Sequence, residues 1–219
     1  MSLKPTPTEH ALPLRAADFV SLAEALDYAS QGETGVNFYG GSGKLSAAIT
    51  YRALRDQARE LGLRLLGLGL ERGDCVALVA DTHPDFLRFF FACQYAGLVP
   101  VALPASLQLG GHHVYVKQLR GLLKSCGAPV AMASEDFLRF LREAAEGVAT
   151  RFVGTPADFD RLPPADGPLE PLSGNELAYL QFTSGSTRFP RGVMITQEQA
   201  FSNLSGIVRD GLKVGPTDR

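Results

Sequence analysis

Cys75-Val-Ala-Leu-Val-Ala80 is an unbroken apolar run. A run of this length without polar alternation is typical of a strand that is covered on both faces, as in a parallel sheet. Two further apolar runs of the same kind follow at Val99-Pro-Val-Ala-Leu103 and at Val130-Ala-Met-Ala133. The sequence therefore predicts a mostly parallel sheet that contains these three strands.

Helical patterns alternate with these strands. Asp81 or Thr82 is expected to cap the helix that follows the first run, and Gly97 ends that helix. The second run is followed by a helix that stops at Gly127, and the third by an amphipathic helix over 135–146. This alternation of strands and helices predicts an α/β fold with helices layered on a mostly parallel sheet.

The N-terminal region is predicted to hold a helix and a hairpin. The helix is expected over residues 12–30, and Gly32 and Gly35 then break the helical pattern. Short strands at 36–39 and 45–50 are joined by a glycine-rich turn, which predicts a β-hairpin, and Thr50 can cap a helix that begins directly after it.

A proline-rich stretch divides the chain. After a short strand at 151–153, the sequence predicts an irregular connection because prolines recur in it, at Pro156, Pro163, Pro164, Pro168 and Pro171. We expect residues 1–172 to form a first α/β subdomain and residues 173–219 to begin a second one.

Charge and composition exclude several classes of function. The formal net charge is −2, from 21 basic and 23 acidic residues, so no positive field exists to attract a nucleic-acid backbone. Residues 1–13 lack the apolar centre of a secretory signal, and no later run approaches the length of a membrane span. We expect no nucleic-acid partner, no membrane span and a cytoplasmic location.

Cysteines and histidines do not predict a metal site. The cysteines lie far apart in apolar surroundings, which favours reduced core thiols: Cys75, Cys93 and Cys126. The histidines show no pair at a metal-ligand spacing with a cysteine or carboxylate: His10, His83, His112 and His113.

The segment that carries chemistry lies between two strands predicted at 177–182 and 193–195. Hydroxyl groups, a glycine that lets backbone N–H groups approach an anion, and two guanidinium groups are concentrated there. Phosphate oxygens need such donors. The candidate polyphosphate-binding residues are Thr183, Ser184, Gly185, Ser186, Thr187, Arg188, Arg191 and Gly192.

The order of these residues resembles a known signature. Thr183-Ser-Gly-Ser-Thr-Arg-Phe-Pro-Arg-Gly-Val193 is similar to the phosphate loop of the adenylate-forming superfamily, which includes acyl-CoA synthetases, luciferases and peptide-synthetase adenylation domains. Upstream, Gly73-Asp-Cys-Val-Ala77 and Ala96-Gly-Leu-Val-Pro-Val-Ala-Leu-Pro104 look like the N-terminal subdomain of the same superfamily. The superfamily usually has glycine at the position of Arg188 and lysine at that of Arg191. The arginine after Ser-Gly-Ser-Thr resembles the fatty acyl-AMP ligases.

The resemblance implies an enzyme that uses ATP and Mg²⁺ to convert a fatty acid into an acyl adenylate, which passes to an acyl carrier protein. Segment 183–192 would hold the β- and γ-phosphates. Ser184 and Ser186 would not act as nucleophiles, because no histidine shows a sequence pattern that identifies it as their general base. The resemblance places the catalytic residues beyond Arg219, so we expect this chain alone to be inactive. Two alternatives stay open: an acyl-CoA synthetase that transfers to coenzyme A, and a non-catalytic interaction module with the same fold.

Overall fold

The computed structural model describes residues 12–105, 111–183 and 191–215. Its strands are β1 (Gly35–Tyr39), β2 (Leu45–Thr50), β3 (Cys75–Val79), β4 (Val99–Leu103), β5 (Val130–Met132), β6 (Phe152–Gly154), β7 (Leu177–Thr183) and β8 (Arg191–Thr196). Its helices are α1 (Leu22–Ala29), α2 (Tyr51–Gly67), α3 (Pro84–Ala96), α4 (Gly111–Cys126), α5 (Glu135–Ala145), α6 (Pro156–Asp160), α7 (Gln197–Gly206) and a π-helical turn η1 (Ile207–Gly211).

A six-stranded sheet is the centre of the fold, with strand order β6-β5-β3-β4-β7-β8. Four of its pairings are parallel: β3 with β4, β3 with β5, β5 with β6, and β4 with β7. Only the pairing of β7 with β8, at the edge, is antiparallel. The predicted α/β fold with a mostly parallel sheet is therefore confirmed.

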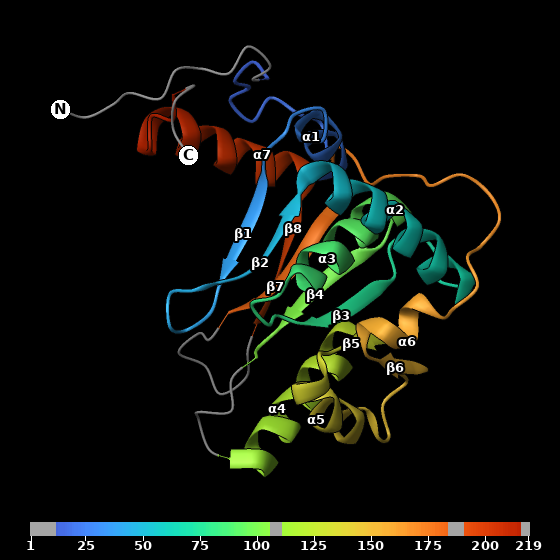
Figure 1. The fold of residues 1–219 in the computed structure, drawn as a ribbon. Coiled ribbons are helices and arrows are strands. Elements are labelled where there is room, and N and C mark those ends of the chain that lie inside the picture. Colours follow the sequence, from blue (N-terminus) through green and yellow to red (C-terminus); the bar gives the residue numbers. More distant parts are fainter. Residues whose placement is uncertain (1–11, 106–110, 184–190, 216–219) are drawn as a thin grey trace.

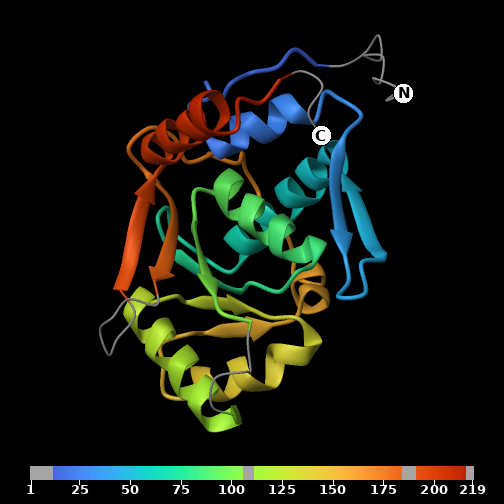
Figure 2. The same ribbon diagram turned by 90° about the vertical axis from the view of Figure 1, so that its left-hand side faces the viewer.

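Helices cover both faces of this sheet (Figures 1 and 2). Along β3, Val76 and Leu78 point into the core that β3 shares with α1, α2, α3 and α6. Ala77 and Val79 point the other way, into the core under α4 and α5. Because successive side chains of a strand alternate between faces and both faces are buried here, every residue from Val76 to Val79 must be apolar.

A threonine begins one helix, and a glycine ends another, at the positions that the sequence predicts. The Thr50 hydroxyl accepts a hydrogen bond from the Ala53 N–H and caps α2, directly after the antiparallel hairpin of β1 and β2. Gly97 ends α3 in the left-handed region at φ 72°, where a residue with a Cβ would be strained.

The prediction that Asp81 or Thr82 caps α3 is wrong. His83 is the N-cap, and its Nδ1 accepts a hydrogen bond from the Asp85 N–H. The Asp81 carboxylate has other partners, because it accepts from the Thr82 N–H at 2.8 Å and from the Ser134 hydroxyl at 3.1 Å. Asp81 thus links the ends of β3 and β5 instead of beginning a helix.

Two other element predictions need correction. The first helix does not span 12–30: it begins at Leu22, because the Ser21 hydroxyl accepts from the Glu24 N–H and forms the N-cap. Pro156 lies in a short helix, α6, and not in an irregular connection, because Thr155 and Asp158 form a reciprocal capping box at its start.

No helix within the three described ranges has the length and apolar character that a membrane crossing requires.

Candidate functional site

The antiparallel pair of β7 and β8 carries the candidate phosphate-binding segment. Since β7 runs parallel to β4 and β3, it ends at the same edge of the sheet as they do, the carboxyl edge. In Figure 1 the pair extends away from α7 at the top of the molecule. In open α/β sheets, ligands bind outside the carboxyl ends of the strands, near the point where successive connections change face. Here that point lies between β3 and β4, because α3 and α4 cover opposite faces.

Two candidate residues close the described part of this hairpin. Thr183 and Arg191 face each other as the last pair of the ladder, and the Thr183 hydroxyl donates to the Arg191 carbonyl oxygen at 3.4 Å. Both residues are exposed. The ladder therefore brings a hydroxyl and a guanidinium group, eight residues apart in sequence, to adjacent positions at the carboxyl edge.

Gly192 has a packing reason to be glycine. It pairs with Phe182 across the hairpin, and a Cβ added to it would lie 3.1 Å from Leu180 Cδ2 and 3.3 Å from Phe182 Cε1. Those contacts are tighter than ordinary van der Waals separations. Gly192 thus lets these two side chains lie close to the β8 backbone.

Five of the predicted site residues lie outside the described residues: Ser184, Gly185, Ser186, Thr187 and Arg188. Their role stays a prediction from the sequence. What the structure places is the pair of strands that leads into and out of the segment that they occupy.

A second polar group lies at the carboxyl edge, at the ends of β3 and β5. Asp81, His83 and Ser134 line a pocket of about 20 Å³ there together with Val79, Asp85, Phe86, Met132 and Pro156. A pocket of this volume has room for about one water molecule. It cannot hold a nucleotide, so this group supports the loops of the edge and does not itself form a substrate cavity.

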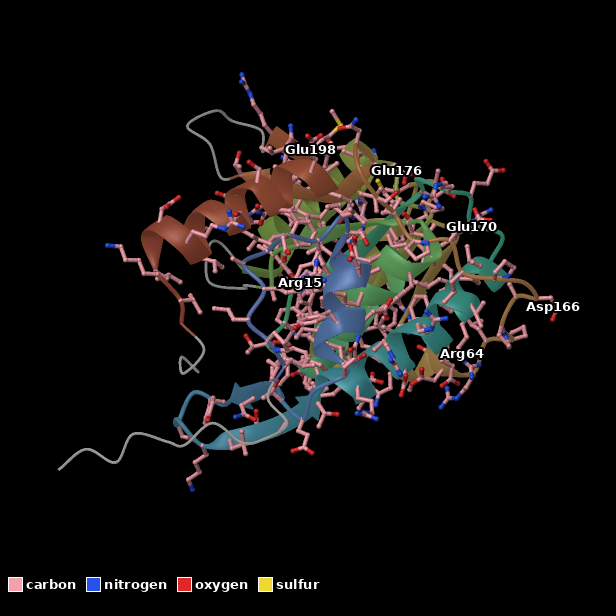
Figure 3. The ribbon with its side chains drawn as sticks, turned by 90° about the horizontal axis from the view of Figure 1, so that it is seen from above. Arg15, Arg64, Asp166, Glu170, Glu176 and Glu198 are labelled. Atoms are coloured by element: carbon pink, nitrogen blue, oxygen red, sulfur yellow. The ribbon has the colours of Figure 1, made fainter. Side chains whose placement is uncertain are left out.

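A larger hollow lies at the opposite, amino edge of the sheet. Its volume is about 380 Å³, and its lining includes Arg72, Gly73, Val99 and Glu176. Figure 3 looks onto this side of the molecule, where the labelled Glu198, Glu176 and Glu170 follow one another along one edge of the view. Because the hollow is at the amino edge of the strands, it is not placed as nucleotide sites in such sheets are.

Arg72 ties the long connection before β7 to the start of β3. Its guanidinium group donates to both carboxylate oxygens of Glu176, at 2.6 and 2.7 Å. It also donates to the carbonyl oxygens of Glu170 and Pro171, at 2.7 and 3.1 Å. These bonds fix the amino end of β7 beside the start of β3. Local sequence patterns do not predict this ion pair, because Arg72 and Glu176 lie 104 residues apart.

The three cysteines do not provide a nucleophile. All three are free thiols, and Cys93 is fully buried. Burial raises the pKa of the Cys75 thiol to about 11, and it raises the pKa values of Cys93 and Cys126 as well. Since the thiolate is the reactive form, these groups stay protonated and inert near neutral pH.

The buried Cys93 thiol is expected to make the fold less stable in alkali. Because its pKa is raised in the folded state above the unfolded value of about 8.5, the folded state binds the proton more tightly. The stabilisation is complete below about pH 8.5 and is lost as the pH rises above it. At about pH 9.5 the loss should be about 1 kcal/mol, measured by urea unfolding.

The matched control is Cys93→Ala, which removes the ionisable group from the same place. It should cost stability at every pH but give a flatter decline between about pH 8 and pH 10. An equally steep decline in this variant would show that other groups cause the pH dependence.

Within the described ranges, no group of three or more histidine, cysteine, aspartate or glutamate side chains could hold a metal ion.

Comparisons with known proteins agree with this arrangement. A family model described as AMP-binding enzyme matches residues 33–219. A protein of Caulobacter vibrioides, provisionally named an acyl-CoA synthetase, is 41% identical over 214 residues, which are 98% of this chain and 37% of that protein. A long-chain-fatty-acid–AMP ligase of Mycolicibacterium smegmatis is 33% identical over 171 residues, 73% of this chain and 25% of the ligase.

A solved structure from a study of fatty acyl-adenylate ligases of E. coli and L. pneumophila has the same fold. The TM-score is 0.90 at 42% sequence identity, over 94% of this chain and 37% of that chain. This chain therefore spans less than two fifths of the length of these relatives.

Proposed function

The chain belongs to the family of AMP-binding enzymes, and from that premise we propose that the protein that carries it activates a fatty acid with ATP as an acyl adenylate. One observation carries the proposal. A segment rich in hydroxyl and guanidinium groups, 183–192, begins and ends at the carboxyl edge of a parallel sheet. The similarity to a solved structure from work on fatty acyl-adenylate ligases supports the same reading.

In the proposed reaction, a carboxylate oxygen of the fatty acid attacks the α-phosphorus of ATP. A bond forms between that oxygen and phosphorus, the bond from the α-phosphorus to the bridging oxygen breaks, and pyrophosphate leaves with the electron pair. The donors of segment 183–192 hold the β- and γ-phosphates and stabilise the charge that develops on the leaving group. Thr183 and Arg191 would contribute from the two sides of the hairpin.

Mg²⁺ belongs to the proposal only as the usual companion of ATP. The described residues offer no acidic cluster that could hold it. The residues of segment 183–192 would act on the phosphates through hydrogen bonds and positive charge.

For the second half-reaction we propose transfer of the acyl group to an acyl carrier protein. Arg188, after Ser-Gly-Ser-Thr, is the sequence feature that favours this acceptor, and the Mycolicibacterium smegmatis relative is a fatty acid–AMP ligase by name. The name of the Caulobacter vibrioides relative favours coenzyme A instead. The division into a first subdomain over 1–172 and the beginning of a second at 173–219 is likewise a proposal about the whole protein. In this chain, both stretches contribute strands to one sheet.

The test is fatty-acid-dependent exchange of labelled pyrophosphate into ATP, in the natural protein that carries this chain. Exchange that requires a fatty acid supports the proposal, and its absence with every chain length would favour a non-catalytic module. The acceptor is then identified by mass spectrometry of reactions that contain either a phosphopantetheinylated carrier protein or coenzyme A.

A further inference from the structure

Two buried glutamines form a chain of hydrogen bonds at the base of the β7–β8 hairpin. Gln197 accepts from the Leu22 N–H at 2.9 Å through Oε1 and donates through Nε2 to Gln94 Oε1 at 2.6 Å. Gln94 donates in turn through Nε2 to the Ala178 carbonyl oxygen at 2.6 Å. Both glutamine residues have 0% exposure. We call this chain, from Leu22 to Ala178, the glutamine relay.

The relay has only one possible direction. A backbone N–H such as that of Leu22 can only donate, and a carbonyl oxygen such as that of Ala178 can only accept. Each glutamine must therefore point its oxygen toward Leu22 and its nitrogen toward Ala178. A buried chain that is satisfied in one orientation only specifies a single arrangement of the elements that it joins.

At β7 the relay supports a residue, Ala178, that has no partner in either neighbouring strand. The paired residues of β4 and β7 are Val101 with Leu180 and Ala102 with Gln181, so this pairing begins two residues after Ala178. The register between β7 and β8 also shifts between Leu177 and Tyr179, which leaves Ala178 without a partner in β8. Such a bulge bends a strand and changes its direction. Gln94 therefore holds the residue at which the direction of β7 is set.

At β8 the relay holds the other strand. Gln197 is the first residue of α7 and follows Thr196, the last residue of β8. The Gln197 N–H also donates to the Glu176 carbonyl oxygen at 3.0 Å, just before β7. The ends of both strands that lie away from segment 183–191 thus meet at the relay.

We propose that Gln94 and Gln197 are positioning residues for the phosphate-binding segment, an inference that rests on the proposed function. They contact no substrate and act through β7 and β8. Thr183 lies five positions after Ala178, a distance of about 17 Å along a strand. A tilt of about 5° at the base would move the far end by about 1.5 Å, and a displacement of about 1 Å can cost a large factor in rate.

The experiment compares Gln94→Met and Gln197→Met with Tyr95→Phe in the natural protein. Tyr95 is the neighbour of Gln94 on α3, is equally buried, and donates to Asp27 Oδ1 at 2.7 Å. That bond joins α3 to α1 and does not involve the hairpin. Tyr95→Phe therefore removes a hydrogen bond of a fully buried α3 residue without touching β7 or β8, and serves as the matched control.

Both glutamine variants should lower kcat/KM for ATP in pyrophosphate exchange about tenfold or more, with the KM for the fatty acid unchanged. Tyr95→Phe should keep its kcat/KM for ATP although its melting temperature falls. Equal losses in all three variants, or none in the glutamine variants, would overturn the inference. The proposed function is tested apart from it by Arg191→Ala: if that variant loses activity and the glutamine variants do not, only the inference fails.

Should the glutamine variants not fold, hydrogen exchange on the unmodified protein decides. N–H groups in the first turn of a helix have no partner within the helix and normally exchange fast. The Leu22 amide should instead exchange as slowly as the amides of β7 and β8, because Gln197 holds it. Fast exchange at Leu22 beside a protected hairpin would overturn the inference.

Discussion

Phe89→Ala is expected to lower the free energy of unfolding by about 3–5 kcal/mol, the range for truncating a fully buried phenylalanine. Phe89 has 0% exposure and stands edge-to-face against Phe159, with ring centroids 4.9 Å apart. Phe159 makes a similar contact with Phe152 at 4.8 Å. These three rings join α3, α6 and β6, so the cavity left by Phe89 would loosen all three elements. Urea unfolding followed by circular dichroism measures the loss.

Phe90→Ala is the matched control, because it changes the same residue type on the next position of α3. Phe90 is only partly buried, and its ring lies 6.1 Å from that of Tyr179. Its truncation should cost clearly less than that of Phe89. We interpret Phe89 as a core residue and not as part of a tunnel for the acyl chain, because it belongs to the buried cluster that α2 and α3 form with the sheet. That interpretation fails for Phe89 if Phe89→Ala leaves stability unchanged and alters the preferred acyl chain length.

Arg191→Ala is expected to lower kcat/KM for adenylate formation about 100-fold in the natural protein, the scale for removal of one donor that stabilises developing charge. Arg191 is exposed at the carboxyl edge and stands opposite Thr183. Pyrophosphate exchange at several ATP concentrations measures the effect.

Two variants control for this result. Arg191→Lys keeps the charge but loses the forked pair of donors, so it should retain part of the activity. Arg161→Ala removes an exposed arginine that pairs with Asp158 on α6, and it should leave the activity unchanged. If Arg191→Ala kept full activity and full affinity for ATP, the phosphate-binding role of segment 183–192 would lose its support.

The sequence predicted the helices and strands well where burial is uniform along an element. Along β3 both faces are covered, so the apolar run marks the strand directly. The prediction was wrong where several side chains compete for one role. Asp81 is a good N-cap by residue type, but it accepts from Ser134, and His83 caps α3 instead. The sequence does not reveal that competition, because Ser134 lies 53 residues away from Asp81.

The residues of the candidate site likewise differ in how well the sequence predicts them. Thr183 and Arg191 could be chosen from residue type and order, because the donors for a polyphosphate are concentrated in one short segment. The groups that hold the base of the hairpin could not be identified from residue type and order. Nothing local connects Gln94 with Gln197, because the two residues lie 103 positions apart in the sequence.

By itself, the sequence of this protein determined the layered α/β fold, the family resemblance and the segment that would bind phosphate, because each depends on short-range patterns of burial and residue type. Only the tertiary structure decided that β7 lies beside β4, that Arg72 holds Glu176, and that two glutamines meet under the hairpin. The physical reason is that such contacts depend on strand order and on the packing of α1, α3 and α7, and local periodicity contains no information about either.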